Sequence, residues 1–172
     1  MFAGAMTAAS LLPFGKLAGK LFGRGTVGAV ETTSRTAILD GSSIRFSQSN
    51  VKTTLPSLVD YMNARGWGEL PPIDVVKMLD GTYVAIDNTR LAAAKLTRTP
   101  VRAIVRTFDD AWDVARDNLN QVFKNPKTGA RPDTWGEALM NRIAGQKREW
   151  KTLHPEGSPF TGVHPQTGPV NP

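Results

Sequence analysis

Residues 73–106 read IDVVKMLDGTYVAIDNTRLAAAKLTRTPVRAIVR, and this stretch decides the fold. It opens with a short apolar and β-branched run, which is typical of a strand. Asp80-Gly81 follows and is a strong hairpin-turn signal, because Gly accepts a positive φ without a Cβ clash. Residues 83–86 then supply the return strand. The first half of the stretch therefore predicts a β-hairpin.

A helix is expected directly after the hairpin. Either Asp87 or Asn88 can cap it, because each side chain can accept a hydrogen bond from a free backbone N–H of the first turn. Residues 91–96, LAAAKL, are strong helix formers. Pro100 ends the helix, and residues 101–105 read as a third strand. A hairpin followed by a helix and a strand predicts a mixed α+β unit.

Basic residues dominate the second half of this unit. No acidic residue lies between Asp87 and Asp109. The basic residues in that interval are Arg90, Lys95, Arg98, Arg102 and Arg106. A helix N-terminus offers free N–H groups and a positive dipole end to an anion, and Arg90 in the first turn can add a bidentate contact to phosphate. A solvated helix face that keeps the chain soluble explains the same pattern, and both interpretations stay open.

Residues 83–94, YVAIDNTRLAAA, resemble the strand-to-helix motif of the ParB and sulfiredoxin superfamily. In that family the matching corner binds nucleotide or nucleic-acid phosphate. Upstream, LPPI at residues 70–73 and IRFSQ at residues 44–48 resemble the opening segments of a ParB-like subgroup. That subgroup occurs at the C-terminal ends of bacterial polymorphic toxins, notably of the Rhs type.

The resemblance continues downstream. The subgroup carries a tryptophan-led helix with Arg and Gln, which correspond here to Arg142 and Gln146. The segment LHPEGS at residues 153–158 resembles the motif that follows this helix. Thr89 and His154 differ from the residues that the subgroup usually has at these positions.

This resemblance implies a ParB/sulfiredoxin-like α+β fold, with a small mixed sheet, flanking helices and a helical C-terminal extension. We expect an apolar, Ala/Gly-rich leader and linker at residues 1–41 and a ParB-like toxin domain at residues 42–160. A Pro/Gly-rich tail follows at residues 161–172. A length of 172 residues fits one domain with tails.

The first 30 residues differ in character from the rest. They are rich in Ala, Gly, Leu and Phe, and before Glu31 their only charges are Lys16, Lys20 and Arg24. The apolar run at residues 2–14 is too short to span a bilayer and lacks the basic start of a secretory signal. A membrane-active segment and a flexible leader after a larger carrier protein both stay open. Membrane contact is expected only through residues 1–30.

The segments before residue 73 predict one strand and one helix. Residues 31–41 are polar and rich in Thr and Ser, as in a linker, and residues 44–46 read as a short strand. Pro56 and Gly66 bracket a helix. Its apolar face carries Leu55, Leu58, Val59 and Met62.

Two more helices are expected after residue 106. Asp109-Asp110 opens the first, because acidic residues are favourable in a first helical turn. Its apolar stripe, interpreted as core rather than as a platform for stacking bases, consists of Trp112, Ala115, Leu119 and Val122. The second begins at Thr134 with a capping box that pairs Thr134 with Glu137. It should run to about Trp150, and a Pro-rich tail, docked or frayed, follows.

Composition excludes several classes of site. The chain has no cysteine, which excludes disulfides and Cys-based zinc sites. Its two histidines, His154 and His164, exclude a centre with three His ligands. No P-loop is present, which argues against an ordinary NTPase. A formal net charge of +6 and a pI of about 9.9 favour a polyanionic partner such as nucleic acid, or an acidic binding protein.

The candidate site gathers residues from the matching motifs. Candidate catalytic residues are Asp87, Asn88, Arg90 and His154; candidate substrate- or phosphate-binding residues are Gln48, Lys95, Arg98, Arg142, Gln146 and Ser158. Asn88 and Arg90 would hold phosphate. Asp87 is the best candidate for a Mg²⁺ ligand or a base, since carboxylate suits a hard cation, or else it is only a helix cap. His154 is a general acid–base candidate because its ordinary pKa lies near neutrality, or else it is a surface loop residue.

The resemblance implies an effector toxin that cleaves phosphodiester bonds in the nucleic acid of a competitor cell, with DNA as the first expected substrate. Two alternatives stay open: a nucleotide-dependent phosphoryl-transfer or nucleotide-hydrolysing toxin, and a non-catalytic DNA-binding or membrane-active domain. A toxin also implies an acidic immunity protein over the region of Asn88 and Arg90, and a larger carrier protein fused upstream. We expect synthesis in the bacterial cytoplasm, export in a secreted effector, and action in the target-cell cytoplasm.

Overall fold

A computed structural model describes residues 35–113 and 121–162 of the chain. The fold is α+β, as expected, with a five-stranded mixed sheet in the order β1-β5-β3-β4-β2. The strands are β1 (Arg35–Leu39), β2 (Ile44–Phe46), β3 (Ile73–Lys77), β4 (Tyr83–Ala85) and β5 (Val101–Thr107). The helices are α1 (Leu55–Arg65), α2 (Asn88–Thr97), α3 (Trp135–Ala144) and α4 (Arg148–Leu153), with 3-10 turns η1 (Gly41–Ser43) and η3 (Gln121–Phe123).

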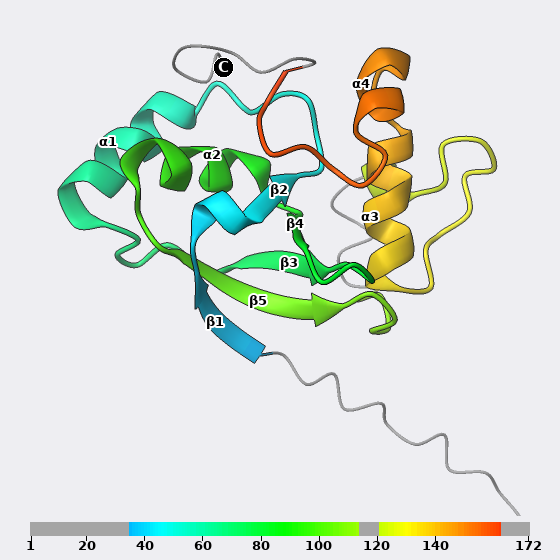
Figure 1. Cartoon of the computed structure of the whole chain (residues 1–172), viewed down its shortest axis with the longest axis horizontal. Helices are drawn as coiled ribbons and strands as arrows, with labels where there is room; N and C mark the ends of the chain where they lie inside the picture. Colours follow the sequence, from blue (N-terminus) through cyan, green and yellow to red (C-terminus); the bar gives the residue numbers. More distant parts are fainter. Residues whose placement is uncertain (1–34, 114–120, 163–172) are drawn as a thin grey trace, which may run out of the picture.

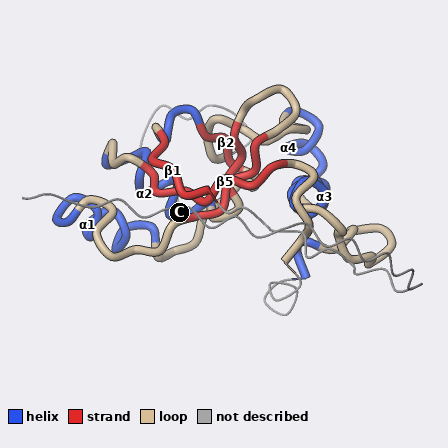
Figure 2. The backbone as a smooth tube through the Cα atoms, turned by 90° about the horizontal axis from the view of Figure 1, so that it is seen from below, coloured by secondary structure: helices blue, strands red, loops and turns tan. Residues whose placement is uncertain are grey.

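Figures 1 and 2 show helices at both ends of the molecule, with the strands between them. The paired helices α1 and α2 lie at one end, and α3 and α4 lie at the other. Each end has its own apolar cluster. One contains Ile73, Leu91 and Met62 among others, and the second is built around Trp135 and Trp150.

The predicted hairpin, helix and strand are confirmed. Strands β3 and β4 pair antiparallel, with Val76 opposite Val84. Gly81 in the turn has φ +84°, the conformation that favours glycine. Asp87 caps α2, because its side chain accepts from the backbone N–H of Arg90. Strand β5 then returns parallel to β3, which places the start of α2 at one end of the sheet.

The expected strand and helix before residue 73 are also confirmed. Strand β2 pairs parallel to β4. Helix α1 buries Leu55 and Met62, and Leu58 and Val59 pack partly buried against the same cluster. The predicted apolar face is therefore the face that packs against the core.

The prediction of a linker at residues 31–41 is wrong for Arg35–Leu39, which form strand β1. Arg35–Leu39 pairs antiparallel with β5, with Ala37 opposite Ala103. Leu39 packs against the first core cluster, whereas Ile38 is 65% exposed. Tertiary pairing with a strand more than 60 residues away overrides the polar local sequence.

The prediction that a helix begins at Asp109-Asp110 is wrong, because a turn lies there. The Asp110 carboxylate accepts hydrogen bonds from the backbone N–H and the hydroxyl of Thr107, at 2.7 and 2.6 Å, and this closes a turn. Ala111 then bridges to Thr134. Trp112 is buried, as its interpretation as core predicted. Ala115 and Leu119 lie outside the described residues.

The helix that we expected from Thr134 to Trp150 is two helices. Thr134 caps α3 by accepting from Glu137 N–H at 3.1 Å, and the Glu137 carboxylate accepts from Asp133 N–H at 2.8 Å rather than from Thr134. Helix α3 ends at Gly145, and α4 starts after Lys147. The break turns α4 so that Trp150 is fully buried in the second cluster.

Residues 155–162 fold back onto the sheet. Phe46 and Ser158 exchange backbone hydrogen bonds of 2.6 and 2.9 Å, and Gly162 N–H donates to Ser49 O at 2.6 Å. This part of the expected tail is docked, and residues 163–172 lie outside the described residues. Within the described residues, no helix has the length and apolar character needed to cross a bilayer.

Candidate functional site

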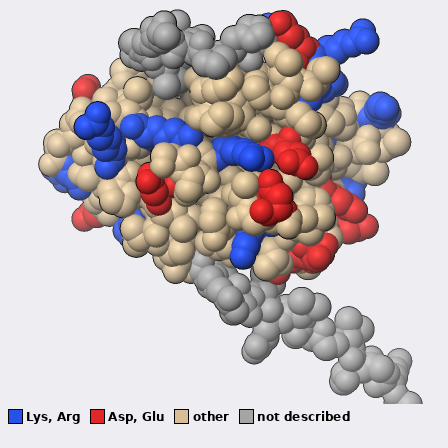
Figure 3. Space-filling model, in the orientation of Figure 1, with Lys and Arg blue, Asp and Glu red and all other residues tan. Residues whose placement is uncertain are grey.

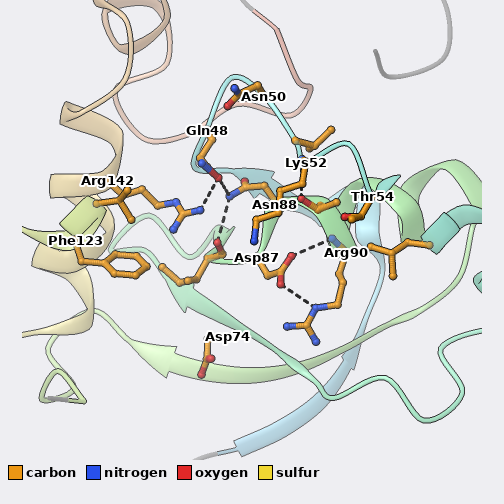
Figure 4. Close-up of a pocket in the computed structure, with 15 residues that line it drawn as sticks. Gln48, Asn50, Lys52, Thr54, Asp74, Asp87, Asn88, Arg90, Phe123 and Arg142 are labelled. Carbon is orange, nitrogen blue, oxygen red and sulfur yellow. Dashed lines mark hydrogen bonds and ion pairs between the residues drawn. The ribbon is translucent and has the colours of Figure 1, made fainter. Parts of the chain in front are cut away.

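A pocket of about 570 Å³ opens at the start of α2, and its lining residues come from both ends of the molecule. Its walls come from the loop after β2, from α2, and from η3 and α3. The charged groups that line it are Lys52, Asp74, Asp87, Arg90 and Arg142. Its volume lies in the range that holds small organic ligands. Figure 4 shows Arg142 and Phe123 on one side of Asn88, and the pair of Asp87 and Arg90 on the other.

Asn88 lies in this pocket but is only 2% exposed. Its Oδ1 accepts from Ser47 N–H at 2.8 Å. Its Nδ2 has three acceptors within reach: Ser47 Oγ at 2.9 Å, Gln48 Oε1 at 3.2 Å and Ile86 O at 3.3 Å. An amide nitrogen has only two hydrogens, so no side-chain donor of Asn88 is left for a phosphate. In this arrangement Asn88 fastens the loop after β2 to the start of α2.

Asp87 and Arg90 form a pair at the other side of the pocket. Asp87 Oδ1 accepts from Arg90 N–H at 3.0 Å, and Asp87 Oδ2 accepts from Arg90 Nε at 2.9 Å. Arg90 also donates to the Pro71 carbonyl. Asp87 is thus a true helix cap, and its carboxylate also orients a guanidinium at the pocket wall. An anion that binds Arg90 would compete with Asp87 for it.

Arg142 reaches the pocket from α3. Its Nη2 donates to Gln48 Oε1, and its guanidinium carbon lies 5.1 Å from the centroid of the Phe123 ring. Burial lowers the pKa of Arg142 to about 10, and the nearby charge of Asp87 opposes this shift. Nε of Arg142 is buried and has no hydrogen-bond partner within the described residues.

The structure does not bring His154 to this pocket. Its ring packs between Trp150 and Phe160, with centroids 5.4 and 5.2 Å away. Ser158 is fully buried, and its hydroxyl accepts from Phe160 N–H at 3.2 Å. The candidate catalytic residues Asp87 and Arg90 are therefore together, while His154 is separate from them.

Gln146 has a bracing role at the edge of the site. Its Oε1 accepts from Ser49 N–H at 3.2 Å, and its Nε2 donates to Arg142 O at 3.3 Å. It does not line the pocket at α2 but a smaller one of about 330 Å³ beside α3. Its contacts hold the loop after β2 against α3.

Lys95 and Arg98 line a different cavity, of about 750 Å³, between α2 and η1. Lys95 Nζ donates to Pro159 O at 2.9 Å and lies 4.6 Å from the centroid of the Phe46 ring. Burial lowers the pKa of Lys95 to about 8, against the charge of Asp40, which raises it. The phosphate-binding candidates are therefore dispersed: Gln48 and Arg142 line the pocket at α2, Lys95 and Arg98 line this cavity, and Gln146 and Ser158 line neither.

Surface charge is mixed on the face shown in Figure 3. Lys and Arg side chains lie beside Asp and Glu side chains there, and this face carries no continuous basic band. Within the described residues, no group of three or more His, Cys, Asp or Glu side chains is placed to hold a metal ion. Any cation at Asp87 would need further ligands from water, from neutral protein oxygens or from a substrate.

The pocket is also lined by residues that were not among our candidate site residues, including Lys52, Asp74 and Phe123. Asp74 is buried and paired with Arg106, whose Nε lies 3.0 Å from Asp74 Oδ1. The presence of Asp74 within a strand of buried apolar residues was a usable signal. Phe123 had no such signal, because a lone Phe in a polar segment is common.

Comparisons with known proteins add little to this geometry. No family model and no curated protein matches the sequence. Among solved structures, the crystal structure of sulfiredoxin from Arabidopsis thaliana aligns with 50% of this chain and 98% of its own, at 24% identity and a TM-score of 0.35. A match at this TM-score carries no argument about the family or the function of this chain.

Proposed function

We propose that this chain is a toxin effector domain that cleaves phosphodiester bonds in nucleic acid, and that the pocket at the start of α2 is its site. The observation that carries the proposal is the set of charges in one cavity: Arg90 and Arg142 with the carboxylate of Asp87. Guanidinium groups bind phosphate bidentately. The second pocket carboxylate, Asp74, is neutralised inside the core by Arg106.

Asp87 is the group that we propose for proton transfer. A phosphate bound to Arg90 would replace Asp87 as its acceptor, and the freed carboxylate oxygen could then accept a proton from the attacking water. Mg²⁺ is a second proposed role, in which Asp87 and phosphate oxygens of the substrate would hold the ion together. The resemblance to ParB-like toxins in sequence motifs supports nucleic acid, and DNA first, as the substrate.

Plasmid DNA and total RNA incubated with the purified full chain, with Mg²⁺ and with a chelator, test this function. Asp87→Asn is the informative variant, because Asn caps a helix as well as Asp but cannot act as a base. We expect cleavage by wild type and a rate at least about 100-fold lower in the variant. Asp80→Asn is the matched control, because Asp80 lies in the exposed hairpin turn, outside the pocket.

Intact DNA and RNA with the wild-type protein would end the nuclease proposal. Cleavage by Asp87→Asn at the wild-type rate would instead remove Asp87 from the mechanism.

The size of the pocket favours a second candidate, a nucleotide as substrate. A cavity of about 570 Å³ suits a ligand as small as a nucleotide. Thermal shift with a panel of nucleoside triphosphates and oligonucleotides separates the two, because a ligand stabilises the folded state that binds it. A shift with triphosphates alone favours the nucleotide.

A toxin of this kind would need a partner that protects its producer. We propose an acidic immunity protein that covers the pocket, together with an upstream carrier protein, export from the bacterial cytoplasm, and action in the cytoplasm of a target cell. Complementary charge speeds and orders such an encounter. An inhibitor that leaves Arg90 and Arg142 exposed in the complex would contradict the proposed interface.

A further inference from the structure

The start of α2 has fewer free groups for an anion than its sequence implied. Both polar atoms of the Asn88 side chain already have hydrogen-bond partners, in Ser47, Gln48 and Ile86. Asp87 takes both the backbone N–H and Nε of Arg90. A ligand phosphate at this corner therefore finds Nε of Arg90 already paired with Asp87, and the guanidinium N–H groups that remain are on Nη1 and Nη2.

Arg142 is in the opposite situation. Within the described residues it has no ion pair, and its guanidinium donates only to the neutral side-chain oxygen of Gln48. A phosphate oxygen is a stronger acceptor for a guanidinium than an amide oxygen is, because it carries charge. Within the described residues the hydrogen bonds of the Gln48 side chain all go to Oε1, so Nε2 is a second donor at the same place.

We propose that Arg142 and Gln48, backed by the ring of Phe123, form an anion subsite at the α3 end of the pocket. The ligand class is a phosphate group of the substrate, separate from the reacting phosphate beside Arg90 and Asp87. This assignment rests on the proposed function only in calling the bound anion part of a substrate. The subsite would position a nucleic acid or nucleotide that carries two phosphates.

The environment of Arg142 supports this role independently. Burial that lowers the pKa of a guanidinium to about 10 means that the folded protein keeps a poorly solvated cation there. Nε adds a buried N–H without a partner within residues 35–113 and 121–162. A methionine, which has neither a charge nor a side-chain N–H, would avoid both costs. Groups kept at such a cost are typical of functional sites rather than of cores.

The C-terminal helical unit supplies two of the three residues of this subsite, and the loop after β2 supplies Gln48. Phe123 comes from η3 and Arg142 from α3, whereas Arg90 and Asp87 come from the unit of α2. Figure 4 shows the two sets on either side of Asn88. A substrate with one phosphate at Arg90 and a second at Arg142 would thus bridge the two ends of the molecule.

Inorganic phosphate is the probe for the test, with the full chain as the protein. Arg142→Met is compared with Arg148→Met, which removes the same charge from an exposed position on the neighbouring helix α4. Phosphate affinity comes from the rise in melting temperature with phosphate concentration. We expect Arg142→Met to bind phosphate at least tenfold more weakly than wild type and to be as stable or more stable without phosphate. Arg148→Met should match wild type in phosphate affinity.

An NMR titration of wild type decides the case in which Arg142→Met does not fold. The Nε–Hε signal of Arg142 should shift as phosphate binds, and a titration that leaves it unmoved overturns the subsite. Equal phosphate affinity in Arg142→Met and wild type also overturns it.

The outcomes separate the subsite from the nuclease proposal. If Arg142→Met loses phosphate affinity while wild type leaves DNA and RNA intact, the subsite stands and the nuclease proposal falls. If Arg142→Met cleaves nucleic acid and binds phosphate as wild type does, the subsite falls and the nuclease proposal stands.

Discussion

Asn88 holds the loop after β2 in place through hydrogen bonds to Ser47, a structural role that its position in a phosphate-binding motif did not suggest. Its amide holds the backbone N–H and the hydroxyl of Ser47, both of which are buried. The Ser47 hydroxyl in turn donates to Ala85 O at 2.7 Å. Sequence alone could not separate this role from phosphate binding, because both use the same residue type at the same helix position.

Replacing Asn88 by Ala should therefore destabilise the protein before it affects any ligand. Truncation leaves the buried N–H of Ser47 unpaired, and such a group costs about 1–3 kcal/mol. We expect urea denaturation to show a loss of about 2 kcal/mol in the unfolding free energy. Amide hydrogen exchange should be faster at residues 47–50.

Asn50→Ala is the control for this loss, because Asn50 is an exposed residue of the same pocket. It should change stability by less than about 0.5 kcal/mol. Equal stabilities of the two variants would contradict the bracing role of Asn88.

Lys95 makes the stability depend on pH in a predictable direction. Its pKa falls from 10.5 to about 8 on folding, because burial disfavours the charged amine. Between these values the unfolded chain binds more protons than the folded chain, so the contribution of Lys95 to the unfolding free energy rises with pH. Below pH 8 both states are charged, and the folded state bears the full cost of the buried charge.

Urea denaturation of wild type and Lys95→Met from pH 7 to pH 10 measures this effect. We expect the difference in unfolding free energy to move in favour of wild type as the pH rises above 8. Lys127→Met removes a charge from an exposed loop and should give a difference that is flat over that interval. A flat difference for Lys95→Met would refute the shift.

Among the elements, those with strong local signals were predicted correctly. The Asp80-Gly81 turn, the Ala-rich run of α2 and Pro100 each act within a few residues, so the hairpin, helix and β5 follow from the sequence. Strand β1 was missed because its pairing with β5 is nonlocal. The helix expected at Asp109 failed because the Asp110 carboxylate binds Thr107 instead of capping a helix.

The candidate site was predictable only in part, because some of its residues meet only through nonlocal contacts. The sequence interpretation named Asp87, Arg90, Gln48 and Arg142, which the structure brings to one pocket. Gln48 and Arg142 are 94 residues apart in the chain. Their proximity came from the family resemblance, since no periodicity reports such a distance. Phe123 had neither source of information.

Helix α3 approaches the sheet so closely that one glycine decides its packing. A Cβ at Gly136 would overlap the ring of Phe108, and Gly136 N–H donates to Phe108 O at 2.8 Å. We expect Gly136→Ala to lower the unfolding free energy by about 1–3 kcal/mol, because overpacking forces the ring or the helix to move. Urea denaturation measures this change.

Gly145→Ala is the matched control at the end of the same helix. A Cβ there meets carbonyl oxygens at 3.5 Å, an ordinary contact, and Gly145 has helical backbone angles. This variant should be neutral or more stable by up to about 1 kcal/mol. If both alanines cost the same, the close approach of α3 is not what Gly136 provides.

At the scale of the whole molecule, β1 shows that the folded domain starts earlier in the chain than we predicted. We expected the domain to start at residue 42, but β1 (Arg35–Leu39) is a strand of the sheet. A fragment that starts at Arg35 should therefore be as stable as the full chain. A fragment that starts at Ser42 should lose at least about 2 kcal/mol, because it loses the β1–β5 hydrogen bonds and the packing of Leu39.

Urea denaturation of the two fragments tests this boundary. Equal unfolding free energies of the two fragments would support the predicted start at residue 42. The Arg35 fragment also serves the functional question. If it still kills a bacterium that expresses it internally, damage to membranes by residues 1–34 is excluded as the cause.

The loop after β2 depends on partners that the ribosome makes much later. Ser49 is held by Gln146, 97 residues onward, and by Gly162. A growing chain can pair β2 with β4 long before either partner exists, since domains begin to fold during synthesis. The wall of the pocket that this loop forms must therefore wait until Gln146 and Gly162 have been synthesised. A chain cut short before Gln146 would carry the sheet without the contacts that hold that wall.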